Sequence, residues 1–299
     1  MPWRSWPNPT QANSPHRASP SGVLSSEMAP AARETARVPL RLLLIGGEDS
    51  SGRAGLGADR ETVALLSRDL PPGMTLSALT VPTAHTVQSG MELHELGARK
   101  AEEWGAEVRH ILADPQKSPA AAKFGLLPGR AHLEMAAEII RELAPRCPVV
   151  LDPVAGTSGG SPFLSRSDLS FLLEHVLPAG PILTPNIPEA ALLTTSDPRQ
   201  LASDPAPRLD AAASLLRAGA AAVLLKGGHG IEDQIQDLLA QPGSEPSWIR
   251  HPRIPGPGLR GSGCRHASAL AVGLAQGQSL IQAARGASAH LAGLMGRRT

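Results

Sequence analysis

Residues 41–47 read RLLLIGG, a continuous apolar run that ends in two glycines. A run of this kind is typical of a parallel strand that is buried on both faces and opens into a loop. Three later segments repeat the pattern and close in Asp, Asn, Lys or Gly: CPVVLDP (147–153), GPILTPN (180–186) and AAVLLKGG (221–228). Between these runs, apolar residues recur with the spacing of a helix, notably at HLEMAAEIIREL (132–143) and ASLLRAG (213–219). The chain is therefore predicted to be an α/β protein with a doubly wound, mostly parallel sheet and helices on both faces.

The segment before this first strand has a different composition. Residues 1–39 are rich in Pro, Ser and Arg and show no sustained helical or strand periodicity, which predicts a disordered extension. Its excess of arginine over acidic residues also fits a transit peptide, and a third interpretation places the true start at Met28. Residues 40–299 then form one domain. Within it, the Pro-, Ser- and Asp-rich segments 197–208 and 241–247 are predicted to be surface connections.

Composition excludes several classes of protein. No run approaches the ~18–20 apolar residues that span a bilayer, so a membrane protein is not expected. Lys and Arg total 28 against 27 Asp and Glu, and aromatic residues make up 2% with no Tyr, so a nucleic-acid partner is not expected either. The two cysteines, Cys147 and Cys264, lack CxxC spacing and are too few for a disulfide framework. A reducing, cytoplasmic compartment is therefore expected.

The most specific local feature is Gly261-Ser262-Gly263-Cys264, followed by a helix of small residues that stops at Gly277. Glycines before a helix let the backbone approach an anion, and the free N–H groups and positive dipole end of the helix hold phosphate oxygens. The positive electrostatic potential at this helix end favours a thiolate, so it predicts a lowered pKa for the thiol of Cys264. The alternative is a small buried cysteine that closes a tight loop-to-helix packing, and the tetrapeptide by itself favours neither.

Six segments in combination favour the anion hole. They are GGEDSSGRAGLGAD (46–59), KFGLL (123–127), VVLDPVAGTSGG (149–160), ILTPNIPEA (182–190), VLLKGGHG (223–230) and GSGC (261–264). Their order and spacing resemble the hydroxymethylpyrimidine and phosphomethylpyrimidine kinases of thiamine biosynthesis, which are members of the ribokinase-like superfamily. The resemblance covers about residues 40 to 298 and implies a ribokinase-like fold. Cys264 agrees with it, because these pyrimidine kinases carry cysteine where the sugar kinases of the superfamily usually carry aspartate.

The resemblance implies a role for each matched position. The implied catalytic residues are the anion-hole positions and the thiol that accepts or steers the hydroxyl proton: Gly261, Ser262, Gly263 and Cys264. The positions implied to contact the substrate are Gly47, Asp49, Asp59 and Leu126. Those implied to bind ATP are Asp152, Asn186 and Lys226, and those implied to hold Mg²⁺ are Asp152 and Glu189.

The residues themselves leave plainer alternatives for some of these positions. The alternative for Asp59 is a charge at the N-terminus of a helix that begins near Arg60. For Glu189 it is an ordinary solvated glutamate in a first helical turn, and for Lys226 it is a strand end whose side chain reaches solvent. Asp152 ends a buried strand, where an unpaired carboxylate is costly, so a metal–nucleotide complex is expected to supply its partner.

Several positions depart from the family pattern. The chain reads Val81-Pro82-Thr83-Ala84 where the family usually reads A-Q-N-T, so Pro82 replaces a glutamine that contacts the pyrimidine. The other departures are Glu48 for serine, Arg53 for glycine, Leu126 for methionine, and Arg265-His266 for the Thr-Leu that commonly follows the cysteine. Arg53 and Arg265 are interpreted either as contacts to a phosphorylated substrate or as solvated charges.

We therefore expect an ATP- and Mg²⁺-dependent kinase that phosphorylates the hydroxymethyl group of hydroxymethylpyrimidine or its monophosphate. Two alternatives stay open. A pyridoxal-type kinase acts on a similar nitrogen ring with a CH₂OH arm, and the loop around Pro82 discriminates between the rings. A catalytically weak relative that binds a pyrimidine or a nucleotide is favoured by Pro82 and Glu48 and opposed by Cys264, Asp152 and Glu189. The resemblance also implies a small-molecule partner and is compatible with a homodimer.

Overall fold

The structure is a computed structural model that describes residues 38–89, 92–157, 162–256 and 258–297. The predicted disordered extension, residues 1–39, lies outside the described residues except for its last two. Val38 and Pro39 are the first residues of strand β1 (Val38–Asp49). Strand β1 therefore includes the two residues before the predicted boundary at residue 40.

The described residues form a nine-stranded sheet in the order β3-β2-β1-β4-β5-β6-β7-β8-β9. Beyond β1 the strands are β2 (Met74–Ser89), β3 (Glu92–Ala98), β4 (Ala121–Phe124), β5 (Val149–Leu151), β6 (Ile182–Leu183), β7 (Ala222–Leu225), β8 (Gln234–Ala240) and β9 (Ser247–Pro252). The pairings from β2 through β7 are parallel, whereas β3, β8 and β9 pair antiparallel at the two edges. The four apolar runs of the sequence become β1, β5, β6 and β7, which confirms the mostly parallel sheet.

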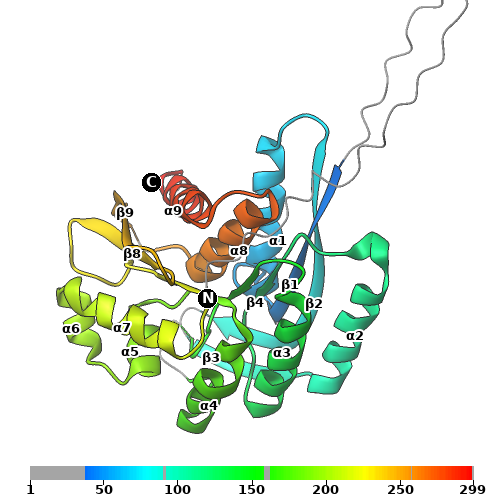
Figure 1. Cartoon of the computed structure of the whole chain (residues 1–299), viewed down its shortest axis with the longest axis horizontal. Helices are drawn as coiled ribbons and strands as arrows, with labels where there is room; N and C mark the ends of the chain where they lie inside the picture. The colour runs from blue at the N-terminus through cyan, green and yellow to red at the C-terminus, as the bar shows by residue number, and fades with distance from the viewer. Residues whose placement is uncertain (1–37, 90–91, 158–161, 257, 298–299) are drawn as a thin grey trace, which may run out of the picture.

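Helices cover both faces of this sheet, as predicted. They are α1 (Gly55–Leu66), α2 (Ala101–Ala113), α3 (Arg130–Leu143), α4 (Arg166–Phe171), α5 (Ile187–Thr194), α6 (Pro198–Ser203), α7 (Ala206–Arg217), α8 (Ser262–Ala275) and α9 (Leu280–Gly296). Side chains alternate along a strand, so Leu43 and Ile45 of β1 face one way and Leu42 and Leu44 the other. The first pair packs with α2, α3, α5 and α7, and the second with α1, α8 and α9 (Figure 1). Across the described residues, no helix has both the length and the apolarity needed to cross a bilayer.

The direction of winding reverses at β1. The chain first adds β2 on one side of β1 and later returns to add β4 on the other side. In sheets of this kind the ligand crevice lies outside the carboxyl ends of the strands at such a switch point. Gly47 of β1 and Leu126 after β4 meet there, since a Cβ atom at Gly47 would lie 2.7 Å from Cδ2 of Leu126. With Leu126 in this place, glycine is the residue that fits at position 47.

One local prediction is wrong. Segment 197–208 is not a surface connection, because it contains α6 and the first turn of α7. Its polar residues begin a helix: the carboxylate of Asp197 accepts a hydrogen bond from the N–H of Arg199, and Pro198 occupies the first helical position. The other segment, 241–247, does connect β8 to β9, with its last residue already in β9.

Replacing Leu44 by alanine tests the packing of the core that holds α1, α8 and α9. The side chain is fully buried in a central strand, so its loss removes apolar contacts and leaves a cavity. We expect the free energy of unfolding to fall by about 2–5 kcal/mol. Leu192→Ala on α5 is the matched control, because that side chain is 55% exposed. Urea denaturation of both variants gives the comparison, and equal losses would contradict the placement of Leu44.

Candidate functional site

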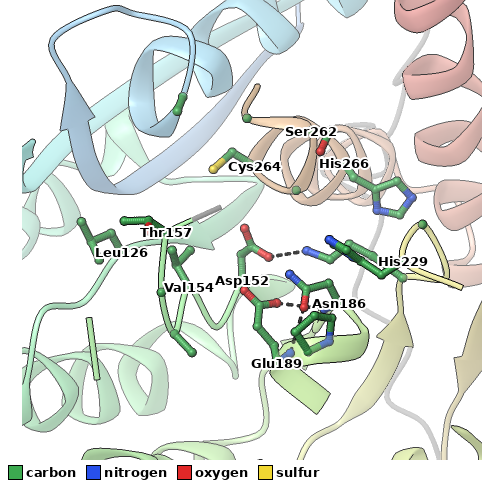
Figure 2. Close-up of a pocket in the computed structure, with 18 of the residues that line it drawn as sticks. Leu126, Asp152, Val154, Thr157, Asn186, Glu189, His229, Ser262, Cys264 and His266 are labelled. Atoms are coloured by element: carbon green, nitrogen blue, oxygen red, sulfur yellow. Dashed lines mark hydrogen bonds and ion pairs between the residues drawn. The ribbon is translucent and has the colours of Figure 1, made fainter. Parts of the chain in front are cut away.

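The carboxyl ends of the parallel strands open into a cavity of about 1840 Å³. Its walls come from segments far apart in the sequence, namely the end of β1, the loop after β4, the ends of β5, β6 and β7, and the first turn of α8 (Figure 2). Every residue that the sequence nominated lines it: Gly47, Asp49, Asp59, Leu126, Asp152, Asn186, Glu189, Lys226, Gly261, Ser262, Gly263 and Cys264. The fold thus brings all of the nominated residues to one place.

The glycine turn before α8 is built closely against its surroundings. Gly261 has a φ of +73°, and a Cβ atom there would lie 2.5 Å from the carbonyl oxygen of Arg53, so glycine is required. A Cβ atom at Gly263 would lie 3.3 Å from Nζ of Lys226, which places the turn beside that ammonium. The first N–H groups of a helix have no partners within it. Here they lie in the cavity wall next to a cation, an arrangement that suits a bound anion.

The thiol of Cys264 does not have the lowered pKa that the sequence predicted. Burial, reinforced by the carboxylates of Asp59 and Asp152, raises the pKa of this thiol to about 11, although Lys123 acts in the opposite direction. A thiolate would be desolvated here, and one nearby ammonium does not compensate for that loss. Cys264 is therefore a protonated thiol at neutral pH, and burial likewise raises the pKa of Cys147 to about 12.

Asp152, which follows β5, is paired within the protein. Its Oδ1 lies 2.7 Å from Nζ of Lys226, and the hydroxyl of Thr184 donates to the same oxygen at 3.1 Å. Burial opposes the charged form, but Lys226 and Lys123 outweigh it and hold the pKa of Asp152 below its usual value. The expectation that the carboxylate of Asp152 is unpaired within the protein is therefore wrong. Its partner is Lys226, which follows β7, two strands away from β5 in the sheet. Lys226 is itself buried and does not reach solvent.

Asn186 and Glu189 form a reciprocal cap at the start of α5. The side chain of Asn186 accepts from the N–H of Glu189, and the carboxylate of Glu189 accepts from the N–H of Asn186, both at 2.8 Å. The Glu189 side chain is buried rather than solvated. Burial raises its pKa to about 7, with Lys226 opposing and Asp152 reinforcing the shift. Figure 2 shows Asn186 and Glu189 across the cavity from Cys264, with Asp152 between them.

The donor set fits a cation that binds together with phosphates. Among the described residues, no group of three or more His, Cys, Asp or Glu side chains is arranged to hold a metal ion. Mg²⁺ rarely uses such a cage, and instead takes one or two carboxylates together with water and substrate phosphates. Asp152 and Glu189 offer two carboxylates on one wall of the cavity, which meets that requirement.

At the other end of the cavity, Asp49 links β1 to the loop before α8. Its carboxylate is buried, accepts from the hydroxyl of Thr86 at 3.4 Å, and lies 3.0 Å from Nη2 of Arg260. Arg260 lines the cavity and was missed in the sequence. A lone arginine in a loop before a glycine turn gives no sequence signal that it will reach a carboxylate more than two hundred residues away.

Asp59 is fully buried in the second turn of α1 rather than at a helix N-terminus, because α1 begins at Gly55 and not near Arg60. It lies 2.8 Å from Nζ of Lys123 in β4. Lys123 was not nominated as a site residue, although a charged residue inside the apolar segment AAAKFGLL (120–127) is an available signal for one.

The charged departures from the family pattern separate into two kinds. Arg265 is buried and lies 2.6 Å from Glu61, so it is neither a substrate contact nor a solvated charge. Glu48 forms a two-point ion pair with Arg60 at 2.7 and 2.9 Å. Arg53, in contrast, is exposed and lines the cavity.

Pro82 lies in β2 beside the cavity-lining end of β1, but is not itself among the residues that line the cavity. Pro82 pairs with Gly46 in the ladder between β1 and β2, and its carbonyl accepts from Arg99 at 2.8 Å. The neighbouring hydroxyl of Thr83 donates to the carbonyl of Leu126 at 2.6 Å. This corner is therefore fixed by backbone and hydroxyl groups where the family pattern places an amide side chain.

A second buried polar cluster, which the sequence gave no sign of, supports the loop after β7. The carboxylate of Asp237 in β8 accepts from the N–H of Gly227 at 2.8 Å and from the hydroxyl of Ser288 in α9 at 2.8 Å. It also lies 3.1 Å from Nε2 of His251, and Ser288 contacts His266 at 3.1 Å. Burial raises the pKa of Asp237, but the hydrogen bonds outweigh it and hold that pKa well below its usual range.

The titration of Glu189 predicts a pH-dependent stability. Its folded pKa of about 7 exceeds its ordinary value of 4.5, so the folded state keeps a proton that the unfolded chain loses between those values. The stability that this group contributes is present below pH 4.5 and is lost as pH rises through 7, with a slope of at most about 1.4 kcal/mol per pH unit. Urea denaturation from pH 4.5 to 8 should show this slope in the difference between the native chain and Glu189→Gln. A flat difference would contradict the shift.

Comparisons with known proteins show the family of this chain. Residues 49–298 match the model of the phosphomethylpyrimidine kinase family. A hydroxymethylpyrimidine/phosphomethylpyrimidine kinase of Streptomyces coelicolor is 35% identical over 256 residues, which cover 85% of this chain and 88% of that protein.

Two solved structures confirm the fold. Phosphomethylpyrimidine kinase from Clostridium difficile aligns with a TM-score of 0.67 at 24% identity, covering 86% of this chain and 99% of that one. Pyridoxal kinase of Bacillus subtilis, in an ADP complex, aligns with a TM-score of 0.72 at 25% identity, covering 84% and 89%. Since the family model spans most of the chain, and a relative above 30% identity does so too, this chain is a small-molecule kinase that belongs to the phosphomethylpyrimidine kinase family.

Proposed function

We propose that this chain uses ATP and Mg²⁺ to phosphorylate the hydroxymethyl group of hydroxymethylpyrimidine, its monophosphate, or both, as part of thiamine biosynthesis. The observation that carries the proposal is the meeting of Asp152, Lys226 and Glu189 with the glycine turn of α8 in one cavity. A buried cation, a helix N-terminus and two carboxylates suit a metal–triphosphate complex, because each compensates charge that the complex brings.

The phosphates of ATP are assigned to the turn formed by Gly261, Ser262 and Gly263. The backbone approaches closely there, and Lys226 adds a positive charge next to Gly263. The cap between Asn186 and Glu189 fixes the start of α5 on the opposite wall. Mg²⁺ would be held by Asp152 and Glu189 together with phosphate oxygens and water, and when bound it supplies positive charge to the transferred group.

The substrate is assigned to the switch point between β1 and β4. Gly47 and Leu126 form an apolar wall there, and Asp49 and Asp59 offer carboxylates to ring nitrogen and amino groups. Phosphoryl transfer needs the hydroxyl in line with the γ-phosphate more than it needs covalent work by the protein. The residues around the substrate ring therefore act by orienting the hydroxyl toward the γ-phosphate. We assign to Cys264, at the first turn of α8, the steering of the hydroxyl proton, or its acceptance when the thiol is deprotonated.

The alternative of a pyridoxal-type kinase is kept because Pro82 stands where the family has an amide side chain. A coupled ADP-release assay over hydroxymethylpyrimidine, its monophosphate, pyridoxal, pyridoxine and pyridoxamine separates the two. We expect the highest kcat/KM with a pyrimidine alcohol or its monophosphate. A higher value for pyridoxal would establish the alternative, and no turnover of any compound would indicate a relative that only binds.

The proposed metal contacts predict a large kinetic effect. Glu189→Gln and Asp152→Asn should each lower kcat by on the order of 10²-fold or more, because they act on charge that develops during transfer. The matched control is Glu138→Gln, since that glutamate is exposed on α3 and pairs with Arg109 at the surface. Steady-state kinetics at saturating Mg²⁺ make the measurement. Turnover near that of the control would remove the residue from the mechanism.

We further propose a reducing, cytoplasmic compartment, as the two cysteines predict, and the resemblance to this family is compatible with a homodimer. Both Cys147 and Cys264 are free thiols, which agrees with such a compartment. Size-exclusion chromatography with light scattering measures the oligomeric state.

A further inference from the structure

The loop after β1 lies between the parts of the cavity assigned to the substrate and to the phosphates. A Cβ atom at Gly261 would lie 2.5 Å from the carbonyl oxygen of Arg53 and 3.0 Å from Cα of Ala54. The backbone of Arg53 is therefore packed against the glycine turn of α8. The same loop touches the substrate wall, because a Cβ atom at Gly55 would meet the carbonyl oxygen of Gly47. Arg53 thus stands where the two parts of the cavity meet.

Hydrogen bonds within the loop fix the backbone at Arg53. The carboxylate of Asp49 accepts from the N–H of Ser51 at 3.2 Å, and the hydroxyl of Ser51 accepts from the N–H of Arg53 at 3.3 Å. The N–H of Gly52 donates to the carbonyl of Asp49 at 2.9 Å. Asp49 is itself paired with Arg260 in the loop before α8. The Arg53 side chain therefore starts from a defined place in the cavity wall.

The charge of Arg53 is not compensated by a carboxylate in the part of the chain that the structure describes. Its side chain is exposed and lines the cavity. Lys123, Lys226 and Arg260 line the same cavity, but each of them is paired with an aspartate. A guanidinium stays protonated in proteins, and its N–H groups match the oxygens of a phosphate in a two-point contact. The unpaired guanidinium of Arg53 therefore suits a phosphate group.

Phosphorylation of the monophosphate differs electrostatically from phosphorylation of the alcohol. A hydroxyl acceptor is neutral, whereas a phosphate monoester carries a charge of about −1.5 to −2 at neutral pH. The monoester must approach the γ-phosphate of ATP, so two groups of like charge are brought together. A cation beside the acceptor phosphate lowers this repulsion, and it has no equivalent task when the acceptor is an alcohol.

We propose that Arg53 determines acceptor specificity, because its guanidinium binds the phosphate of hydroxymethylpyrimidine monophosphate. This inference rests on the proposed function and deepens it, since it names the phosphorylated acceptor as the substrate that Arg53 selects. An oxygen of the acceptor phosphate forms a bond to the γ-phosphorus. The bond between the γ-phosphorus and the bridging oxygen breaks, and its electron pair leaves on ADP. No proton moves when the acceptor phosphate is a dianion, and the guanidinium stays protonated throughout.

Replacing Arg53 by glutamine removes this charge from an exposed side chain. Initial rates are measured separately with hydroxymethylpyrimidine and with its monophosphate, and the products are separated by chromatography. We expect the ratio of kcat/KM for the monophosphate to kcat/KM for the alcohol to fall by about 10- to 100-fold, the size of one charge-assisted contact. Arg53→Lys should lose less of the ratio, because the ammonium keeps the charge but not the two-point geometry.

A binding measurement complements the kinetics. Isothermal titration calorimetry without ATP or Mg²⁺ gives the Kd of the monophosphate, which should rise at least about 10-fold in Arg53→Gln. Arg166→Gln is the matched control, since it removes the same charge from another exposed arginine that lines the cavity, at the start of α4. Its kinetic ratio and its Kd for the monophosphate should stay at the native values.

A kinetic ratio or a Kd for the monophosphate within about twofold of the native value in Arg53→Gln would overturn the proposal. An equal change in Arg166→Gln would overturn it as well, because any positive charge in the cavity would then have the same effect. If Arg53→Gln does not fold, Arg53→Gly gives the same test with the residue that the family pattern has there. Unchanged ratios would leave the proposed phosphorylation standing. No turnover of either acceptor by the native chain would overturn both.

Discussion

The ion pair between Lys226 and Asp152 is the interaction around which the site is arranged. These residues follow β7 and β5, with β6 between them, so the pair forms only when three parallel strands end at one level. Lys226 is held at that level by its own N–H, which donates to the carbonyl of Pro185 at 2.8 Å. Both charges are buried, and either one alone would be costly there. The register of the sheet and the charge balance of the cavity therefore depend on each other.

The same balance is repeated along the cavity. Asp49 is paired with Arg260, Asp59 with Lys123 and Asp152 with Lys226, so three carboxylates of the cavity wall each have a cationic partner in the same wall. Each pair joins elements that are distant in sequence, which makes the site a product of the whole fold rather than of one motif. The charges of these three carboxylates are therefore already compensated within the protein.

The sequence was sufficient for features whose cause is local. The apolar runs ending in polar residues predicted β1, β5, β6 and β7, and the glycine turn predicted the start of α8. Properties that depend on distant partners were not accessible. The partner of Asp152 is Lys226, and the thiol pKa of Cys264 is governed by burial together with Lys123, Asp59 and Asp152, none of which can be weighed without distances. The prediction for segment 197–208 was wrong for a different reason, because Asp and Pro are common both in loops and at helix starts.

The cluster at Asp237 ties the cavity-lining loop after β7 to elements outside the parallel part of the sheet. The loop after β7 is fixed through the N–H of Gly227 by a carboxylate in β8, and that carboxylate is fixed by Ser288 in α9. The antiparallel hairpin and the C-terminal helix are thus a brace for this loop, although they carry no residue assigned to the reaction. Fusions, tags or recombined segments joined near α9 therefore act on the position of this loop, and chimaeras between relatives should exchange β7, β8 and α9 as one block.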